Sequence, residues 1–237
     1  MKAIYKRELQ AFFKSPVAYC VVAFFTALLG LNFWYMNLYN GSIEFSNTLA
    51  VMTSYLTYFA PFITMRLFAD EKKNGKEVLL RTSPISMWQV VLGKYFAAAT
   101  VFLLMNAVTV VCPVIMALFM NEGGVFPLSM TVGSYIGFIL LGLAYLAVGT
   151  FASSVTESQT VAALVGVVLL LAITFLETIG YQIQGWIGQA LIWVSLSSRY
   201  NDFASGLFSI TSAIYYISFT VVVLLITIIN IERKRWN

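Results

Sequence analysis

The chain has 237 residues, of which 60% are hydrophobic and 10% are charged, with a mean hydropathy of +0.85. A soluble domain has about 25% charged residues, and a chain of this length folded in water could not bury so much apolar surface, so the composition excludes an ordinary soluble protein. The two cysteines lie in apolar runs and the sequence has no histidine, so it suggests neither a disulfide framework nor a metal site, and it lacks the commonest general base.

A basic amphipathic segment, residues 2–14, comes first. At helical spacing its two sides differ in chemistry: one carries Tyr5, Leu9, Phe12 and Phe13, and the other carries Lys6, Arg7, Gln10 and Lys14. We predict a helix that lies in the membrane interface with its basic side toward anionic headgroups. The alternative is a helical extension of the first span into water, although Ser15-Pro16 separates the two segments.

Apolar runs long enough to cross a bilayer make up most of the remaining chain. We predict six transmembrane helices, at residues 17–39, 48–68, 88–120, 130–151, 160–176 and 210–231. Pro61 should bend the second span, and the third is too long for a bilayer of about 30 Å unless it tilts or projects. The predicted fold is an all-α integral membrane protein with a single domain, 1–237.

Residues 177–206, between the last two spans, have a mixed character. Glycines interrupt the segment too often for a good span, yet it is too apolar for a free loop. We predict short re-entrant helices on the extracytoplasmic side, with Trp186 and Trp193 at headgroup level. A seventh span is the alternative.

The placement of basic residues predicts the orientation. With six spans both termini lie on one side of the membrane, and thirteen of the fourteen Lys and Arg residues fall on that side, Arg199 being the exception. Cytoplasmic loops carry an excess of Lys and Arg, so we predict a multi-pass protein of the plasma (inner) membrane with both termini cytoplasmic. The net charge of +4 therefore reflects topology and gives no reason to expect nucleic acid.

No catalytic or nucleotide-binding motif is visible. Gly75-Lys76 and Gly93-Lys94 lack the other residues of a phosphate-binding loop, and the near absence of intramembrane charges disfavours an ion-coupled transporter. We predict a non-enzyme without catalytic or metal-binding residues. An intramembrane lipid enzyme using Glu177, Arg199 and Asp202 is an alternative, but no base–nucleophile pair is visible in it.

The longest charged stretch reads DEKKNGKEVLLRTSPISMWQVVLGK and runs from Asp70 to Lys94. It follows the second predicted span and must begin in water. Its segment 70–85 combines both signs of charge with Val78, Leu79 and Leu80, a pattern that suits a cleft on a soluble partner. An ordinary solvated loop is the alternative that the pattern alone leaves open.

This stretch resembles the coupling-helix signature of the ABC-2 family of ABC transporter permeases. The matching positions are Asp70-Glu71, Gly75, Glu77, Leu79-Leu80, Ser83-Pro84 and Gly93-Lys94, whereas Lys76 replaces the usual threonine. The N-terminal segment is similar to the family's elbow helix, and Ser153-Ser154…Gln159 and the run from Arg199 to Gly206 also match. The small size and the absence of an attached ATPase resemble stand-alone permeases of the gliding-motility-associated subgroup.

The resemblance implies a membrane subunit of an ATP-driven transporter, an exporter. It would dock a separate ATP-binding subunit, which binds ATP and Mg, and it would form the substrate path with a second permease subunit, the same or a similar chain. The expected docking residues are Glu71, Lys73, Gly75, Glu77, Leu80, Arg81 and Pro84. Arg66 and Lys94 should brace the coupling helix at its two ends. The alternative is a non-transporting membrane scaffold that recruits a soluble partner to the cytoplasmic face.

Overall fold

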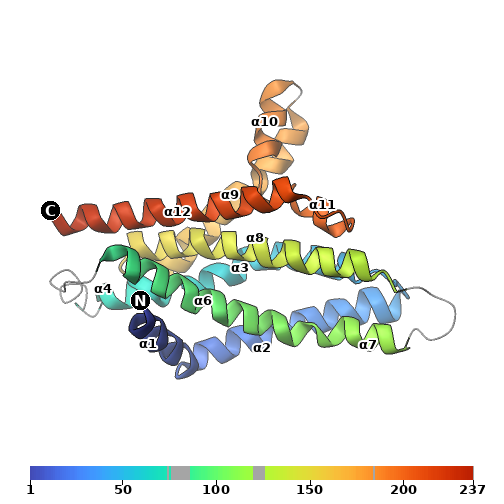
Figure 1. The fold of residues 1–237 in the computed structure, drawn as a ribbon, viewed down its shortest axis with the longest axis horizontal. Helices are drawn as coiled ribbons and strands as arrows, with labels where there is room; N and C mark the ends of the chain where they lie inside the picture. Colours follow the sequence, from blue (N-terminus) through green and yellow to red (C-terminus); the bar gives the residue numbers. More distant parts are fainter. Residues whose placement is uncertain (74, 76–85, 120–125, 184, 237) are drawn as a thin grey trace.

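A computed structural model of the chain describes residues 1–73, 75, 86–119, 126–183 and 185–236. Throughout this described part the structure is helical, without strands. Most helices run along one common axis (Figure 1). Helices α1 and α4 and the C-terminus lie at one end of the bundle, which we call the α4 end, and α7 and α11 lie at the other, the α11 end.

The helices follow one another in a simple up-and-down order. They are α1 (Lys2–Phe13), α2 (Pro16–Phe33), the π-helix η1 (Trp34–Tyr39), α3 (Phe45–Thr64), α4 (Arg66–Lys73), α6 (Met87–Thr109), α7 (Val111–Phe119), α8 (Leu128–Val155), α9 (Gln159–Gln182), α10 (Trp186–Val194), α11 (Tyr200–Ala204) and α12 (Ile210–Trp236).

Prolines and a glycine explain several of these boundaries. Pro16 lies in the first turn of α2, where its missing N–H is not needed. Gly41, between η1 and α3, has a φ of 66°, a left-handed conformation that glycine adopts without strain. Pro113 cannot donate a hydrogen bond to the carbonyl of Thr109, and the long third apolar run is broken between α6 and α7 at Val110.

Five helical segments of the described chain are long and apolar enough to cross a membrane: Pro16–Tyr39, Met87–Leu118, Leu128–Val155, Gln159–Gln182 and Ile210–Arg233. Helix α3, in the second predicted span, is not among them. It carries buried polar residues such as Ser46, Thr48 and Thr57 and packs against α2, α8 and α9. Because protein surrounds much of α3, its hydropathy can be lower than that of a lipid-facing helix.

Helix α8 is the central helix of the bundle. In its most apolar window 72% of residues are buried, compared with 17% for the segment that begins with α2, and it packs against α3, α6, α9, α11 and α12. Glycines allow these close approaches. A Cβ at Gly142 would lie 2.1 Å from Phe102 Cζ of α6, and one at Gly137 would lie 2.6 Å from Phe203 Cβ of α11.

The region between the last two long helices forms a projecting hairpin. Helix α9 continues through Gln182, past the predicted end of its span at Leu176, and α10 packs back against it. Figure 1 shows this hairpin rising from the side of the bundle. Gly188 makes the return possible, since a Cβ there would lie 1.9 Å from the Ile183 carbonyl oxygen. Trp186 and Trp193 are 79% and 64% exposed.

Candidate functional site

Helix α4 leads directly into the predicted docking segment, and its surroundings form the candidate site. Of the predicted docking residues, Glu71 and Lys73 lie in α4. Gly75 follows with a φ of 67°, the left-handed conformation typical of a residue just past a helix end. The remaining four, Glu77, Leu80, Arg81 and Pro84, lie outside the described residues.

Lys94 is the centre of the site. Its side chain is fully buried, although it comes from α6, and its ammonium group lies 3.1 Å from Glu8 Oε1 of α1 and 3.0 Å from Glu71 Oε2 of α4. The same ammonium donates a hydrogen bond to the carbonyl oxygen of Leu67. It also lies 5.0 Å from the centre of the Phe68 ring. One lysine thus joins three helices, and its partner Glu8 lies 86 residues away in the sequence.

Arg7 closes this cluster on its solvent side. Its guanidinium contacts Glu8 at 2.7 Å and Glu71 at 2.5 Å, and both carboxylates are only 13% exposed. Burial lowers the pKa of Arg7, but its hydrogen bonds and charge attraction to Glu8 and Glu71 together raise that pKa by more. The net shift is therefore upward. Two cations and two carboxylates therefore balance in charge at the junction of α1, α4 and α6.

Arg66, the other predicted bracing residue, lies at the start of α4. Its guanidinium is 3.7 Å from Asp70, one turn later in the same helix, and 5.6 Å from the centre of the Phe12 ring of α1. Arg66 thus contacts α1 through the Phe12 ring, whereas its ion pair with Asp70 lies within α4.

The opposite side of α4 is held by the end of α8 and the start of α9. Ser153 Oγ accepts hydrogen bonds from the backbone N–H groups of Phe68 and Ala69, at 3.1 and 3.3 Å, and donates one to the Met65 carbonyl. The first N–H groups of a helix have no partner within it. Ser153 therefore caps α4 from a different helix, at the break that separates α4 from α3.

Two further contacts complete this side. The Lys72 ammonium donates to the carbonyl oxygen of Ser154, and the Gln159 side-chain amide donates to Asp70 Oδ1. We call the residues that hold α4 from other helices the α4 clamp. They are Arg7, Glu8, Lys94, Ser153, Ser154 and Gln159.

Sequence reasoning identified only part of this arrangement. The helical pattern places Arg7 on the side that faces anionic headgroups and gives no role to Glu8, the single acidic residue of α1. An isolated acid within a basic helix is a signal that could have indicated an inward-facing ion pair. In the sequence, Ser153, Ser154 and Gln159 stand out only through the family resemblance.

The three residues of the alternative enzyme hypothesis do not form a site. Arg199 lies between aromatic rings, 4.3 Å from the Trp193 centroid and 4.9 Å from that of Tyr215, and Asp202 accepts a hydrogen bond from Ser212 at 2.8 Å. Within the described residues no ion pair joins Glu177, Arg199 and Asp202. These contacts are structural, and the described part also has no group of three or more residues suited to a metal ion.

The α4 clamp is thus a mechanical junction in which paired charges fix a short helix. Residues 28–232 match the family model described as ABC-2 family transporter protein, a range that includes every clamp residue except Arg7 and Glu8. A comparison with curated proteins gives no match. The apolar helices and this match together identify a multi-pass membrane protein, and the chain belongs to the ABC-2 family of transporter proteins.

Proposed function

We propose that this chain is the transmembrane subunit of an ATP-driven exporter, and that it docks a separate ATP-binding subunit through residues 70–85. ABC-2 permeases are membrane domains without an ATPase motif of their own and normally work with an ATP-binding subunit. ATP and Mg would be bound by that partner. A second permease subunit, the same or a similar chain, completes the substrate path.

The observation that carries this proposal is the α4 clamp. Glu71 of α4 contacts both Arg7 of α1 and Lys94 of α6, while Ser153 holds the start of the same helix from α8. A displacement of residues 70–85 by a moving partner would therefore act on several membrane helices at once. A passive surface loop has no need of such fixation.

The proposed topology has six spans, with an elbow helix, a coupling helix and both termini in the cytoplasm. The length of α3 supports its assignment as the second of the six spans, because its 20 residues extend about 30 Å, the thickness of the hydrocarbon core. The basic residues of α1 and α4 and the C-terminus of α12 lie at the same end of the bundle (Figure 1). By the positive-inside rule that end would face the cytoplasm of the plasma membrane.

Purification of the tagged chain from native membranes, followed by an ATPase assay, tests the proposal. We expect a P-loop ATPase to copurify and Glu77→Lys to release it or uncouple its turnover, because reversing a charge in the docking surface opposes its partner. Glu232→Lys, at the end of α12, is the matched control and should change neither property.

Two results would contradict this assignment. If no ATPase copurifies under several detergents, the chain is a scaffold that recruits another kind of partner. If the Glu77→Lys variant binds the ATPase normally and the turnover of that ATPase is unchanged, residues 70–85 are not the docking site. A scaffold would also leave the turnover of its partner unchanged by any substitution in the α4 clamp.

A further inference from the structure

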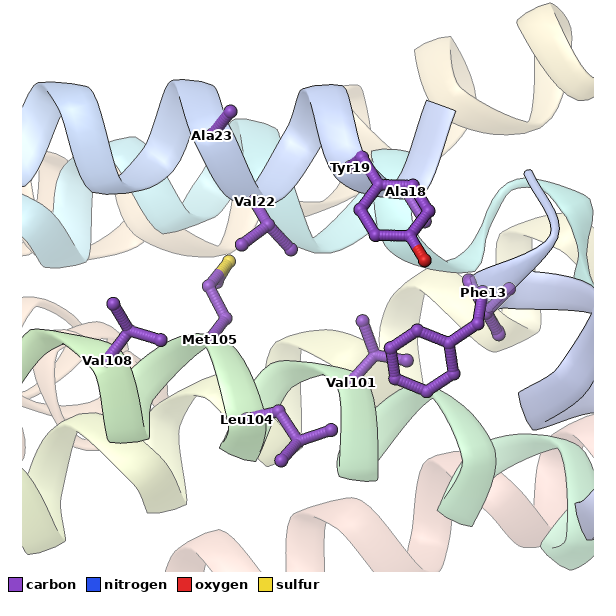
Figure 2. A pocket seen from close by; sticks show the side chains of 10 residues that line it. Phe13, Ala18, Tyr19, Val22, Ala23, Val101, Leu104, Met105 and Val108 are labelled. Atoms are coloured by element: carbon purple, nitrogen blue, oxygen red, sulfur yellow. The ribbon is translucent and has the colours of Figure 1, made fainter. Parts of the chain in front are cut away.

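An apolar groove lies on the outside of the bundle, between α2 and α6, next to α1. Its volume is about 410 Å³, within the range of ligand-binding pockets of about 300–1,000 Å³. Figure 2 shows Val22 of α2 and Met105 of α6 pointing toward one another across it. The lining residues are Phe12, Phe13, Ala18, Tyr19, Val22, Ala23, Val101, Leu104, Met105 and Val108. All are uncharged, and the wall therefore suits hydrocarbon.

One end of this groove differs from the rest. There the side chains of Tyr19 and Phe13 meet, and the tyrosine hydroxyl points toward the phenylalanine (Figure 2). Tyr19 is 58% exposed, and its hydroxyl makes no hydrogen bond to the described part of the chain. Lys14 directly follows Phe13 and is also exposed. The groove thus has the Tyr19 hydroxyl at the end next to α1 and apolar side chains along its length, and Lys14 follows directly after the lining residue Phe13.

The charge of α1 determines what these donors would bind. Lys2, Lys6 and Lys14 are exposed and have no carboxylate partner among the described residues. The single acid of this helix, Glu8, faces inward to Arg7 and Lys94. The exposed side of α1, whose last residues Phe12 and Phe13 line the groove, therefore carries uncompensated positive charge.

We propose that this groove binds one anionic phospholipid of the bilayer. An acyl chain lies between α2 and α6, and the phosphate accepts hydrogen bonds from Tyr19 and Lys14. Buried hydrocarbon and attraction between lysines and an anionic headgroup supply the two parts of the binding energy. The ligand shares its chemistry with any anionic amphiphile, but the permanent availability of bilayer lipid makes phospholipid the occupant.

A photoreactive lipid tests this directly. The full chain is reconstituted into phosphatidylcholine vesicles that contain a trace of phosphatidylglycerol with a diazirine midway along one acyl chain, and labelled residues are mapped by mass spectrometry. We expect labelling to concentrate on Leu104, Met105 and Val108. Unlabelled phosphatidylglycerol should compete, and unlabelled phosphatidylcholine should not.

Substitutions then separate the two halves of the site. Val22→Trp fills the groove and should abolish the concentrated labelling, whereas Val168→Trp, at an exposed position of α9, should leave it unchanged. Lys14→Gln should reduce labelling about fivefold, because one lysine near an anionic surface contributes roughly that factor. Lys14→Arg should retain it.

Three outcomes would overturn the proposal. Labelling spread evenly over exposed helix faces would mean that the groove has no preferred lipid. Equal competition by phosphatidylcholine would mean that the lysines do not select an anion. Loss of the concentrated labelling as the ratio of protein to lipid in the vesicles is raised would show that a second copy of the chain covers the groove. None of these outcomes depends on whether an ATPase copurifies.

Discussion

The two ends of the bundle are built from different interactions. At the α4 end, charges are buried and shared: Lys94 contacts two carboxylates from two other helices, and Ser153 caps α4. At the α11 end, Arg199 stacks on Trp193 and Tyr215, and the α9–α10 hairpin depends on close glycine contacts. The first end is fixed by buried ion pairs shared among several helices, whereas at the second the hairpin is held at its base by hydrogen bonds from Tyr215 and Tyr216 of α12. Movement at α4 should therefore spread through the bundle, and movement of the hairpin should stay local.

Lys94→Leu should produce the largest effect. It removes the cation that compensates Glu8 and Glu71, and breaking a buried ion pair by removing one member destabilises proteins by about 3–5 kcal/mol. The unfolding temperature in detergent and the ATPase turnover of the assembled complex should both fall.

Arg7→Leu is the matched control, because Arg7 contacts the same carboxylates but its side chain is 56% exposed. Its cost should be clearly smaller. Equal losses of stability in Lys94→Leu and Arg7→Leu would show that burial of the lysine gives it no special role in the junction.

Gly188→Ala should have the second largest effect, because it disrupts the hairpin. Its new Cβ would lie 1.9 Å from the Ile183 carbonyl oxygen, and overpacking of this kind costs about 1–3 kcal/mol. The fluorescence of Trp186 and Trp193 should change while ATPase turnover is retained. Gly30→Ala, with nothing within 4 Å of its added Cβ, serves as control. Loss of turnover in Gly188→Ala would contradict the local character of the hairpin.

Ser153→Ala should have a moderate effect at the opposite end. It removes the cap of α4, and loss of a helix cap costs about 1 kcal/mol. Faster hydrogen exchange of the Phe68 and Ala69 amides would report the loss directly. Ser158→Ala is a suitable control because Ser158 precedes α9 without a side-chain capping bond. Unchanged exchange at Phe68 and Ala69 would exclude the capping role.

Arg199→Gln should have the smallest effect. Cation–π contacts at partly exposed sites contribute about 0.5–1 kcal/mol. The change should shift the emission of Trp193 and leave the unfolding temperature within a few degrees of its original value. Arg199→Lys keeps the charge and should retain more of the original spectrum. A collapse of stability would show that this end is as tightly integrated as the α4 end.

The helical fold and most of the apolar helices could be predicted from the sequence because hydropathy and length are local properties. The break between α3 and α4 could not, since the group that caps α4, Ser153, belongs to another helix. The contacts of Lys94 could not be predicted either. Its position beside the charged stretch suggested a bracing role, but its contact with Glu8 joins residues 86 positions apart. The break at Val110 was predictable from Pro113, whereas the long apolar run suggested one continuous span.

The cap that Ser153 provides also sets an order of events during synthesis. The amides of Phe68 and Ala69 donate to a hydroxyl that lies 85 and 84 residues further along the chain, so these hydrogen bonds cannot form until Ser153 has been synthesised. Residues 70–85 leave the ribosome long before that hydroxyl exists. A partner that requires a correctly started α4 would therefore bind only after α8 has entered the bundle. The serine would then keep unfinished chains from assembling with such a partner.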